Sequence, residues 1–254
     1  MSARSIKEII EELESVIRYC IDTGHRAGYF AAMYHHVTCR IKTGIDNNEF
    51  EDGQRMEQLD VLFANRFLHA WNAYRNQKPL TKSWKLAFEA AEQSPLIILQ
   101  HLLLGINAHI NLDLGIAAVE TMKDKDMEGV RKDFNLINAI LGQLSAEVQS
   151  RMGKVSPLIL LLKLHKTNRD EMLIQFSINT AREGAWCFAE ELNPKTGLMY
   201  EQCINNRDQR IAILAENIVN AGKWLKITLK IIRFFEWHKP GNVIKLLQGE
   251  VIRY

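Results

Sequence analysis

The chain has 254 residues, of which 47% are apolar, so it can bury a substantial core as one large domain or two small ones. Its 32 basic and 30 acidic residues nearly cancel, which excludes the strong basic excess of a dedicated nucleic-acid binder. The four cysteines are scattered without a CxxC pair, which favours reduced thiols over a disulfide framework.

Apolar residues recur at helical spacing along almost the whole chain, and no sustained alternation predicts a strand. The N-terminal segment MSARSIKEIIEELESV carries acids where a signal peptide needs an apolar core, so we expect a cytoplasmic protein. The first helix opens with Ser5 and Glu8 at capping-box spacing and should end near Gly24. Further helices are predicted over about 27–42, 54–76 and 82–92.

A long helix is predicted from Ser94-Pro95 to about Met122. Residues 94–112 carry no formal charge, and this stretch is close to the length that spans a bilayer. Polar side chains interrupt it, however, and oppose insertion. The pattern therefore predicts no transmembrane segment but a helix buried at the centre of the protein, over about 95–122.

Downstream, helices are predicted over about 126–153, 157–166, 169–192 and 207–236. No repeat, long linker or change of composition divides the chain, so the simplest interpretation is one all-α domain over 1–254, a multi-helix bundle around the central helix. The sequence NPKTG at 193–197 is the weakest point in this interpretation, because a C-terminal helical appendage could begin after it, at about 198.

The central helix carries polar residues on two sides of an otherwise apolar surface. On an ideal helix Gln100, Asn107 and Asn111 share one arc, whereas His101, Gly105, His109 and Asp113 share another. A helix at the surface would gather its polar residues on one side. Each buried polar group needs a partner, and a structural role in fixing helix register competes with a functional one.

His109 and Asp113 are four residues apart, so their side chains can meet across one helical turn. The pair could ligate one divalent cation, or the carboxylate could orient the imidazole as a general base. His101 lies roughly 12 Å away by helix rise, too far to join the same ion easily. Gly105 leaves room for a ligand or a closely packed helix.

Other candidate residues lie on neighbouring helices. Asp60 interrupts an apolar run, which indicates a ligand role or an ion pair. Arg182 could reach a central site or form a structural ion pair with Glu183. Near the C-terminus a basic stripe of Lys223, Lys226, Lys230 and Arg233 alternates with Leu225, Leu229, Ile232 and Phe235; a membrane-surface role is conceivable, but a core-facing helix with a solvated basic face is the more ordinary interpretation.

The segments YHHVTCRI, MEQLDVLFANRFL and especially LQHLLLGINAHINLDLGIA resemble an uncharacterised helical family known only as a domain of unknown function. The resemblance covers roughly residues 30–120 and, more weakly, TAREGAW. It implies an all-helical fold and a functional focus on Asp60, Asn107, His109 and Asp113, but no established reaction. The HxxxD pair is also similar, more weakly, to the metal sites of helical zinc-dependent phospholipases and single-strand nucleases.

The leading hypothesis from the sequence is a metal-dependent hydrolase in which Asp60, His109 and Asp113 hold zinc, manganese or iron and activate water. A small-molecule substrate, which could be apolar, would then be bound by Asn107, His101 and Arg182. The alternative is a metal-free protein that binds a lipid or isoprenoid between its helices. A second alternative is a scaffold whose polar helix is purely structural. The substrate and the oligomeric state are left open.

Overall fold

A computed structural model describes residues 2–92, 95–122, 128–164, 178–220, 222–237 and 239–249. The described residues form helices, turns and loops, with no strand among them, which confirms the all-α prediction. The first helices are α1 (Ile6–Thr23), α2 (Ala27–Asp46), α3 (Gly53–Arg75) and α4 (Lys82–Glu92). They are followed by α5 (Ile98–Ala108), the π-helical turn η1 (His109–Asp113), α6 (Leu114–Thr121), α7 (Glu128–Val155) and the 3-10 helix η2 (Ile159–Leu164). The last are α9 (Ile178–Leu192), α10 (Gly197–Val219), α11 (Lys223–Phe235) and α12 (Pro240–Gln248).

The two ends of α1 follow the predicted capping signals. The Ser5 hydroxyl accepts a hydrogen bond from the Glu8 amide, and Gly24 ends α1 in the left-handed region at a φ of 68°. The second helix continues past its predicted end near residue 42 to Asp46, and Gly44 in its last turns packs closely against Phe50. Gly24 therefore ends α1, whereas Gly44 lies inside α2.

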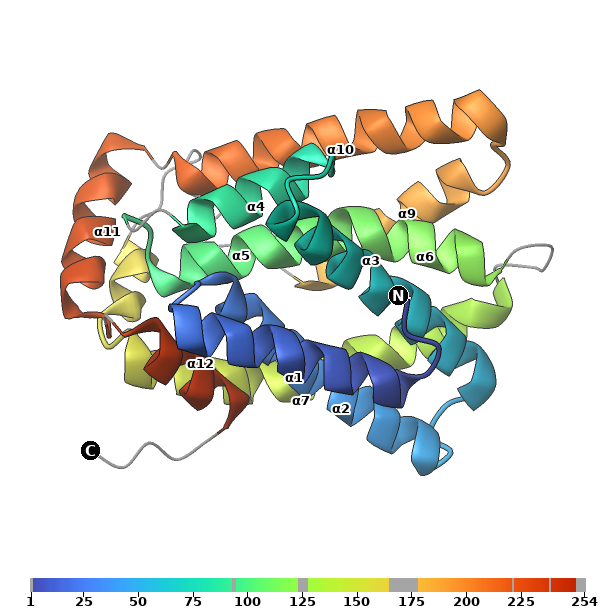
Figure 1. The fold of residues 1–254 in the computed structure, drawn as a ribbon, viewed down its shortest axis with the longest axis horizontal. Coiled ribbons are helices and arrows are strands. Elements are labelled where there is room, and N and C mark those ends of the chain that lie inside the picture. The colour runs from blue at the N-terminus through green and yellow to red at the C-terminus, as the bar shows by residue number, and fades with distance from the viewer. Residues whose placement is uncertain are drawn as a thin grey trace.

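The segment 98–121 crosses the centre of the bundle as α5, η1 and α6 (Figure 1). It packs against α2, α3, α4, α9 and α10. Among the described residues it is the one helix long and apolar enough to span a membrane by composition, but 89% of that apolar window is buried inside the structure. Its apolar character is therefore that of a core helix, as the sequence predicts.

Two glycines bring neighbouring helices against this central segment. A Cβ atom at Gly105 would lie 2.5 Å from Cγ of Phe30 on α2, and one at Gly115 would lie 2.8 Å from the Ala185 carbonyl oxygen on α9. Such distances are shorter than van der Waals contact allows. Gly105 therefore serves the close packing of a helix, one of its two predicted roles.

Buried carboxylates from distant parts of the chain cap several helices. Asp208 of α10 accepts hydrogen bonds from the Lys82 and Ser83 amides at the start of α4. Glu236 accepts from the Ile98 amide at the start of α5, which has an apolar residue at its own capping position. Carboxylates are favoured at helix N-termini, so these contacts are stabilising. They also tie the C-terminal third of the chain to the central helices.

The C-terminal half differs most from the sequence prediction. The helix predicted over 207–236 is two helices, since α10 already begins at Gly197 and α11 starts anew at Lys223. The additional helix α12 packs against α1 and α2, while α10 lies along α4 and α5. The segment 157–166 contains a short 3-10 helix, and residues 165–177, together with Ser94 and Asp126, lie outside the described residues.

Candidate functional site

The centre of the site is the pair formed by His109 and Asp113 within the π-helical turn. Nδ1 of His109 lies 3.1 Å from Oδ2 of Asp113, and both side chains are buried. The Leu114 amide donates to the His109 carbonyl five residues earlier, as a π-helix requires. Such turns are rare in proteins, but those that occur often lie at functional sites. The predicted pairing of these two residues is therefore present, in a helix with an unusual local geometry.

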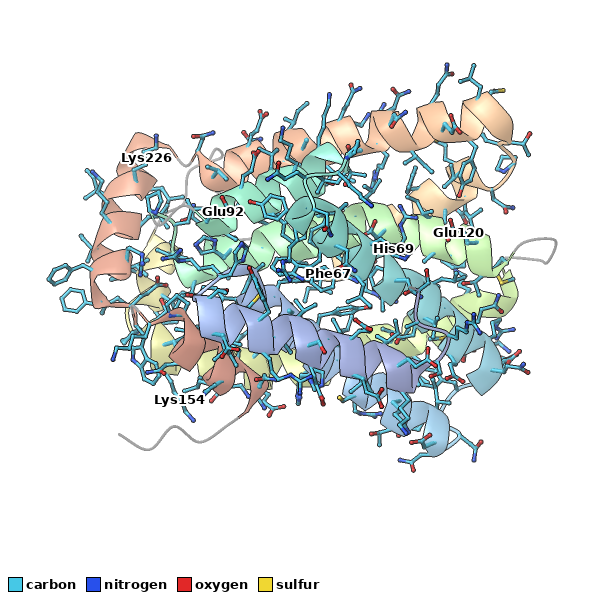
Figure 2. All side chains as sticks on the ribbon, in the orientation of Figure 1. Phe67, His69, Glu92, Glu120, Lys154 and Lys226 are labelled. Carbon is cyan, nitrogen blue, oxygen red and sulfur yellow. The ribbon has the colours of Figure 1, made fainter. Side chains whose placement is uncertain are left out.

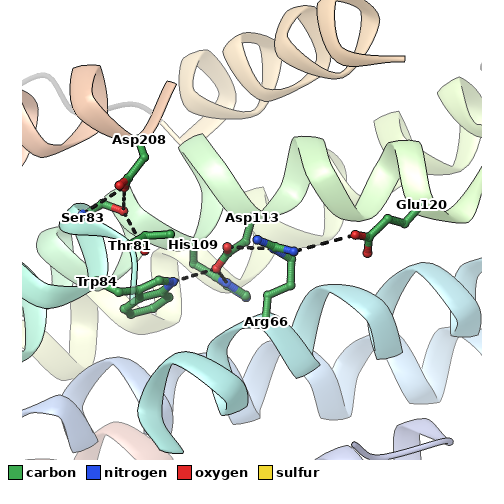
Figure 3. Close-up of polar contacts among 8 residues, drawn as sticks. All are labelled: Arg66, Thr81, Ser83, Trp84, His109, Asp113, Glu120 and Asp208. Carbon is green, nitrogen blue, oxygen red and sulfur yellow. Dashed lines mark hydrogen bonds and ion pairs between the residues drawn. The ribbon is translucent and has the colours of Figure 1, made fainter. Parts of the chain in front are cut away.

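Asp113 is held from both sides (Figure 3). Its Oδ1 accepts a hydrogen bond from Nε of Arg66 at 2.9 Å, and its Oδ2 accepts one from Nε1 of Trp84 at 2.8 Å. The guanidinium supplies the compensating charge that a buried carboxylate needs. Because a carboxylate only accepts, the contact with His109 places the imidazole proton on Nδ1. This geometry suits the orienting role of Asp113 that the sequence left open.

Aromatic rings surround the imidazole of His109. Phe63 stacks on it with centroids 3.6 Å apart, and Tyr34 meets it edge-on with centroids 4.5 Å apart. Burial lowers the pKa of His109, while the hydrogen bond to Asp113 acts in the opposite direction. With the proton on Nδ1, Nε2 carries a lone pair, and it has no hydrogen-bond partner among the described residues.

A cavity of about 960 Å³ lies beside this imidazole. Apolar side chains of α2, α3, α5, α7 and η2 form most of its wall. A few polar or charged side chains also line it, among them Tyr34, Asp60, His109 and Arg182. A large apolar cavity with a few convergent polar groups is typical of sites that bind small molecules.

Asp60 lies on α3, one turn before the Phe63 that stacks on His109. Its side chain is buried, and Oδ2 has no hydrogen-bond partner in the described part of the chain. Burial raises the pKa of Asp60 to about 7, with a smaller contribution from the charge of Glu57. Near neutral pH this carboxyl group can therefore either donate or accept a proton.

Tyr34 and Arg182 add two further polar groups to the cavity wall. The Tyr34 hydroxyl is buried, and no described residue hydrogen-bonds to it. Nη2 of Arg182 donates to the Phe134 carbonyl at 2.9 Å, and its guanidinium lies over the Phe134 ring. Burial lowers the pKa of Arg182 to about 9. Arg182 thus lines the same cavity as His109. Tyr34 was missed in the sequence, because a tyrosine on an apolar helix gives no distinctive sequence signal.

The structure does not bring His101 and Asn107 into the cavity wall. Asn107 donates to the Ile211 carbonyl on α10 and accepts from the amide of Asn111. His101 is buried edge-on to Tyr29, and burial lowers its pKa to about 3. Asn107 thus contacts α10 and His101 contacts α2, and neither belongs to the cavity wall.

Arg207 on α10 supports the π-helical turn and was not identified from the sequence. Its Nε donates to the Asn111 carbonyl at 2.9 Å, and its Nη2 donates to the Gly184 carbonyl on α9 at 3.2 Å. A π-helical turn disturbs the regular ladder of backbone hydrogen bonds, so the carbonyl inside it gains a partner from another helix. Arg207 therefore joins α9, α10 and the site.

For a metal ion the arrangement offers fewer free ligands than the sequence predicts. Both oxygens of Asp113 already accept hydrogen bonds, whereas Asp60 Oδ2 and His109 Nε2 are unpartnered within the described ranges. No group of three or more His, Cys, Asp and Glu side chains placed to hold a metal ion occurs in the part of the chain that the structure describes. On α2, His35 and Cys39 form a separate pair one helical turn apart, with Sγ of Cys39 3.8 Å from Nε2 of His35.

The fold and the site define a class of all-helical proteins in which a histidine held by a buried aspartate lines an apolar cavity. The chain belongs to a family of unknown function, DUF5995, whose family model matches residues 6–221. This confirms the family resemblance inferred from the sequence, and the match includes η1 and every cavity residue named above. No curated protein and no solved structure matches the chain, and the similarity to zinc phospholipases and nucleases is not shown.

Proposed function

We propose that the protein binds an apolar small molecule, a lipid or an isoprenoid with one polar end group, in the cavity beside His109. The observation that carries this proposal is the set of buried polar atoms without described partners, Tyr34 Oη, Asp60 Oδ2 and His109 Nε2, on the wall of one apolar cavity. A buried polar atom without a hydrogen bond costs about 1–3 kcal/mol, so a ligand that satisfies these atoms stabilises the folded state.

The polar groups also suggest which end of the ligand they recognise. Neutral His109 offers a lone pair, and Asp60 offers a proton when it is un-ionised, so a hydroxyl group could donate to one and accept from the other. The pair of His109 and Asp113 also supports proton transfer. His109 would act as general base, and Asp113 holds it in the tautomer that leaves Nε2 unprotonated. An alcohol or a carbonyl compound with an apolar body is therefore the chemical class we propose.

Binding is tested with the full chain purified without a metal-affinity tag. Organic extraction followed by mass spectrometry should release a co-purifying apolar molecule, and farnesol should displace cis-parinaric acid from the cavity. Met33→Trp adds bulk to the cavity wall and should abolish probe binding, whereas Met199→Trp on exposed α10 should leave it unchanged. Equal binding by the two variants would exclude the cavity as the site.

A metal-dependent hydrolase is the second candidate, supported by the two unpartnered atoms Asp60 Oδ2 and His109 Nε2 on one cavity wall. In this alternative those atoms ligate zinc, manganese or iron, and Asp113 orients His109, as carboxylates do for metal-bound histidines. Stoichiometric metal in the tag-free protein, lost from both Asp60→Asn and His109→Gln, would favour it over the first candidate. Metal-free protein that binds the probe would refute it.

A further inference from the structure

The helix α11 exposes an apolar face to solvent. Ile227, Ile231, Phe234 and Phe235 have exposed fractions of 55%, 44%, 74% and 54%. The opposite side of the helix is buried through Leu225, Leu229 and Ile232, as the sequence predicts. Phe235 differs from that prediction, because it belongs to the exposed face and not to the core. Exposed aromatic and branched residues in one patch mark an interaction surface.

Basic side chains accompany this apolar face. Lys226 and Lys230 are exposed, and each precedes an exposed isoleucine. Two adjacent rows therefore run along the helix at intervals of four residues, one of Lys226, Lys230 and Phe234 and one of Ile227, Ile231 and Phe235. Figure 2 shows α11 at the edge of the molecule, with Lys226 near one end of it. The segment Lys223–Phe235 contains no acidic residue. Its charge therefore complements an anionic surface.

The wall of the cavity reaches the surface next to this helix. The 3-10 helix η2 packs against α11, and its residues Ile159, Leu160 and Leu162 line the cavity. Leu160 is 64% exposed although it belongs to the cavity wall. An apolar ligand that leaves a membrane would meet this wall first if α11 lay on the bilayer.

We propose that α11 docks the protein onto an anionic lipid bilayer, with Phe234, Phe235 and the two isoleucines in the interface and Lys226 and Lys230 against the lipid headgroups. A basic amphipathic helix with aromatic residues on its apolar face lies in the plane of a membrane interface. Electrostatic attraction to anionic lipid adds to the burial of these side chains. Docking at this place serves the proposed function, because it brings the cavity wall at η2 close to the source of an apolar ligand.

The experiment is flotation of the full chain with vesicles of phosphatidylcholine alone or mixed with phosphatidylserine. Binding is expected on the mixed vesicles and should weaken with added salt. The double variant Lys226→Glu/Lys230→Glu should bind at least about twenty-fivefold more weakly, since each lysine near an anionic surface contributes roughly a factor of five. The double variant Phe234→Glu/Phe235→Glu should lose binding more than tenfold.

The matched control is Leu198→Glu/Met199→Glu, which changes an exposed apolar pair on α10 and should bind as the wild type does. Circular dichroism and the urea midpoint verify that each variant folds. Wild-type protein that stays in solution with mixed vesicles overturns the proposal, as does equal binding by the α11 variants. If Phe234→Glu/Phe235→Glu instead dissociates a dimer in sedimentation, and no vesicle binding occurs, the face belongs to a second copy. Displacement of cis-parinaric acid in solution tests the cavity independently of α11.

Discussion

The rings of Phe63 and His109 lie face to face, with centroids 3.6 Å apart and an interplanar angle of 8°. Phe63 comes from α3 and His109 from the π-helical turn, so this stack joins two elements at the site. It fixes the plane of the imidazole in which Nδ1 meets Asp113. The tautomer and the orientation of His109 are thus set by different neighbours.

Replacing Phe63 by leucine should loosen the imidazole without removing its hydrogen bond. We expect a loss of about 1–2 kcal/mol in the free energy of unfolding, from the lost aromatic contact and the space that leucine leaves. Nitrogen-detected NMR of the His109 ring should still show the Nδ1–H tautomer, but with resonances broadened by motion of the loosened ring. An unchanged ring spectrum together with unchanged probe affinity would contradict the orienting role of Phe63.

The raised pKa of Asp60 predicts a pH-dependent stability. Unfolded Asp60 releases its proton near its ordinary pKa of 3.8, whereas burial keeps the proton on the folded side chain until about pH 7. Between these pH values the unfolded state binds fewer protons, so the free energy of unfolding falls as the pH rises. The total loss is on the order of a few kcal/mol and is complete above about pH 7.

Asp60→Asn removes this titration, so the variant should gain stability over the wild type from roughly pH 4 to 7 and keep the gain above that range. Urea unfolding of both proteins across this range measures the difference. Burial also raises the pKa of Glu236 to about 7, and Glu236→Gln measures that contribution separately. Parallel curves for wild type and Asp60→Asn would show that Asp60 titrates normally in the folded protein.

The sequence predicted the helical class, the buried central helix and the His109–Asp113 contact, because these depend on local periodicity and on residues one turn apart. Arg66 and Trp84, which hold Asp113, lie 47 and 29 residues away, and no local pattern pairs them with it. The π-helical turn was also not predicted, since a regular α-helix of the same residues fits the same spacing of apolar side chains. The break between α10 and α11 was missed because the apolar spacing continues on both sides of it.

Alanine substitutions at Gly105 and Gly153 should have opposite effects on the free energy of unfolding. Gly105→Ala would place Cβ 2.5 Å from the Phe30 ring, and we expect a loss of about 1–3 kcal/mol from overpacking. Gly153→Ala, within α7, meets no heavy atom within 4 Å and should gain about 0.5–1 kcal/mol from helix propensity. Chemical unfolding measures both, and equal effects would mean that Gly105 is not needed for the approach of α2.

Asp113→Asn separates the roles proposed for the central carboxylate. The amide keeps the shape but removes the charge that Arg66 contacts, and it can donate toward His109 and so favour the tautomer with a proton on Nε2. We expect a loss on the order of 1–3 kcal/mol in unfolding free energy and a clear loss of affinity for farnesol, measured by its displacement of cis-parinaric acid.

The matched control is Asp133→Asn, since Asp133 is equally buried and accepts hydrogen bonds from the Glu51 amide and from Arg55, away from the cavity. This control should lose comparable stability while its probe affinity and metal content stay at wild-type values. If Asp113→Asn lowers metal content in a metal-containing protein, Asp113 acts on a bound ion, directly or through His109. If both variants lose only stability, Asp113 is a structural residue, and His109 does not depend on it for ligand binding.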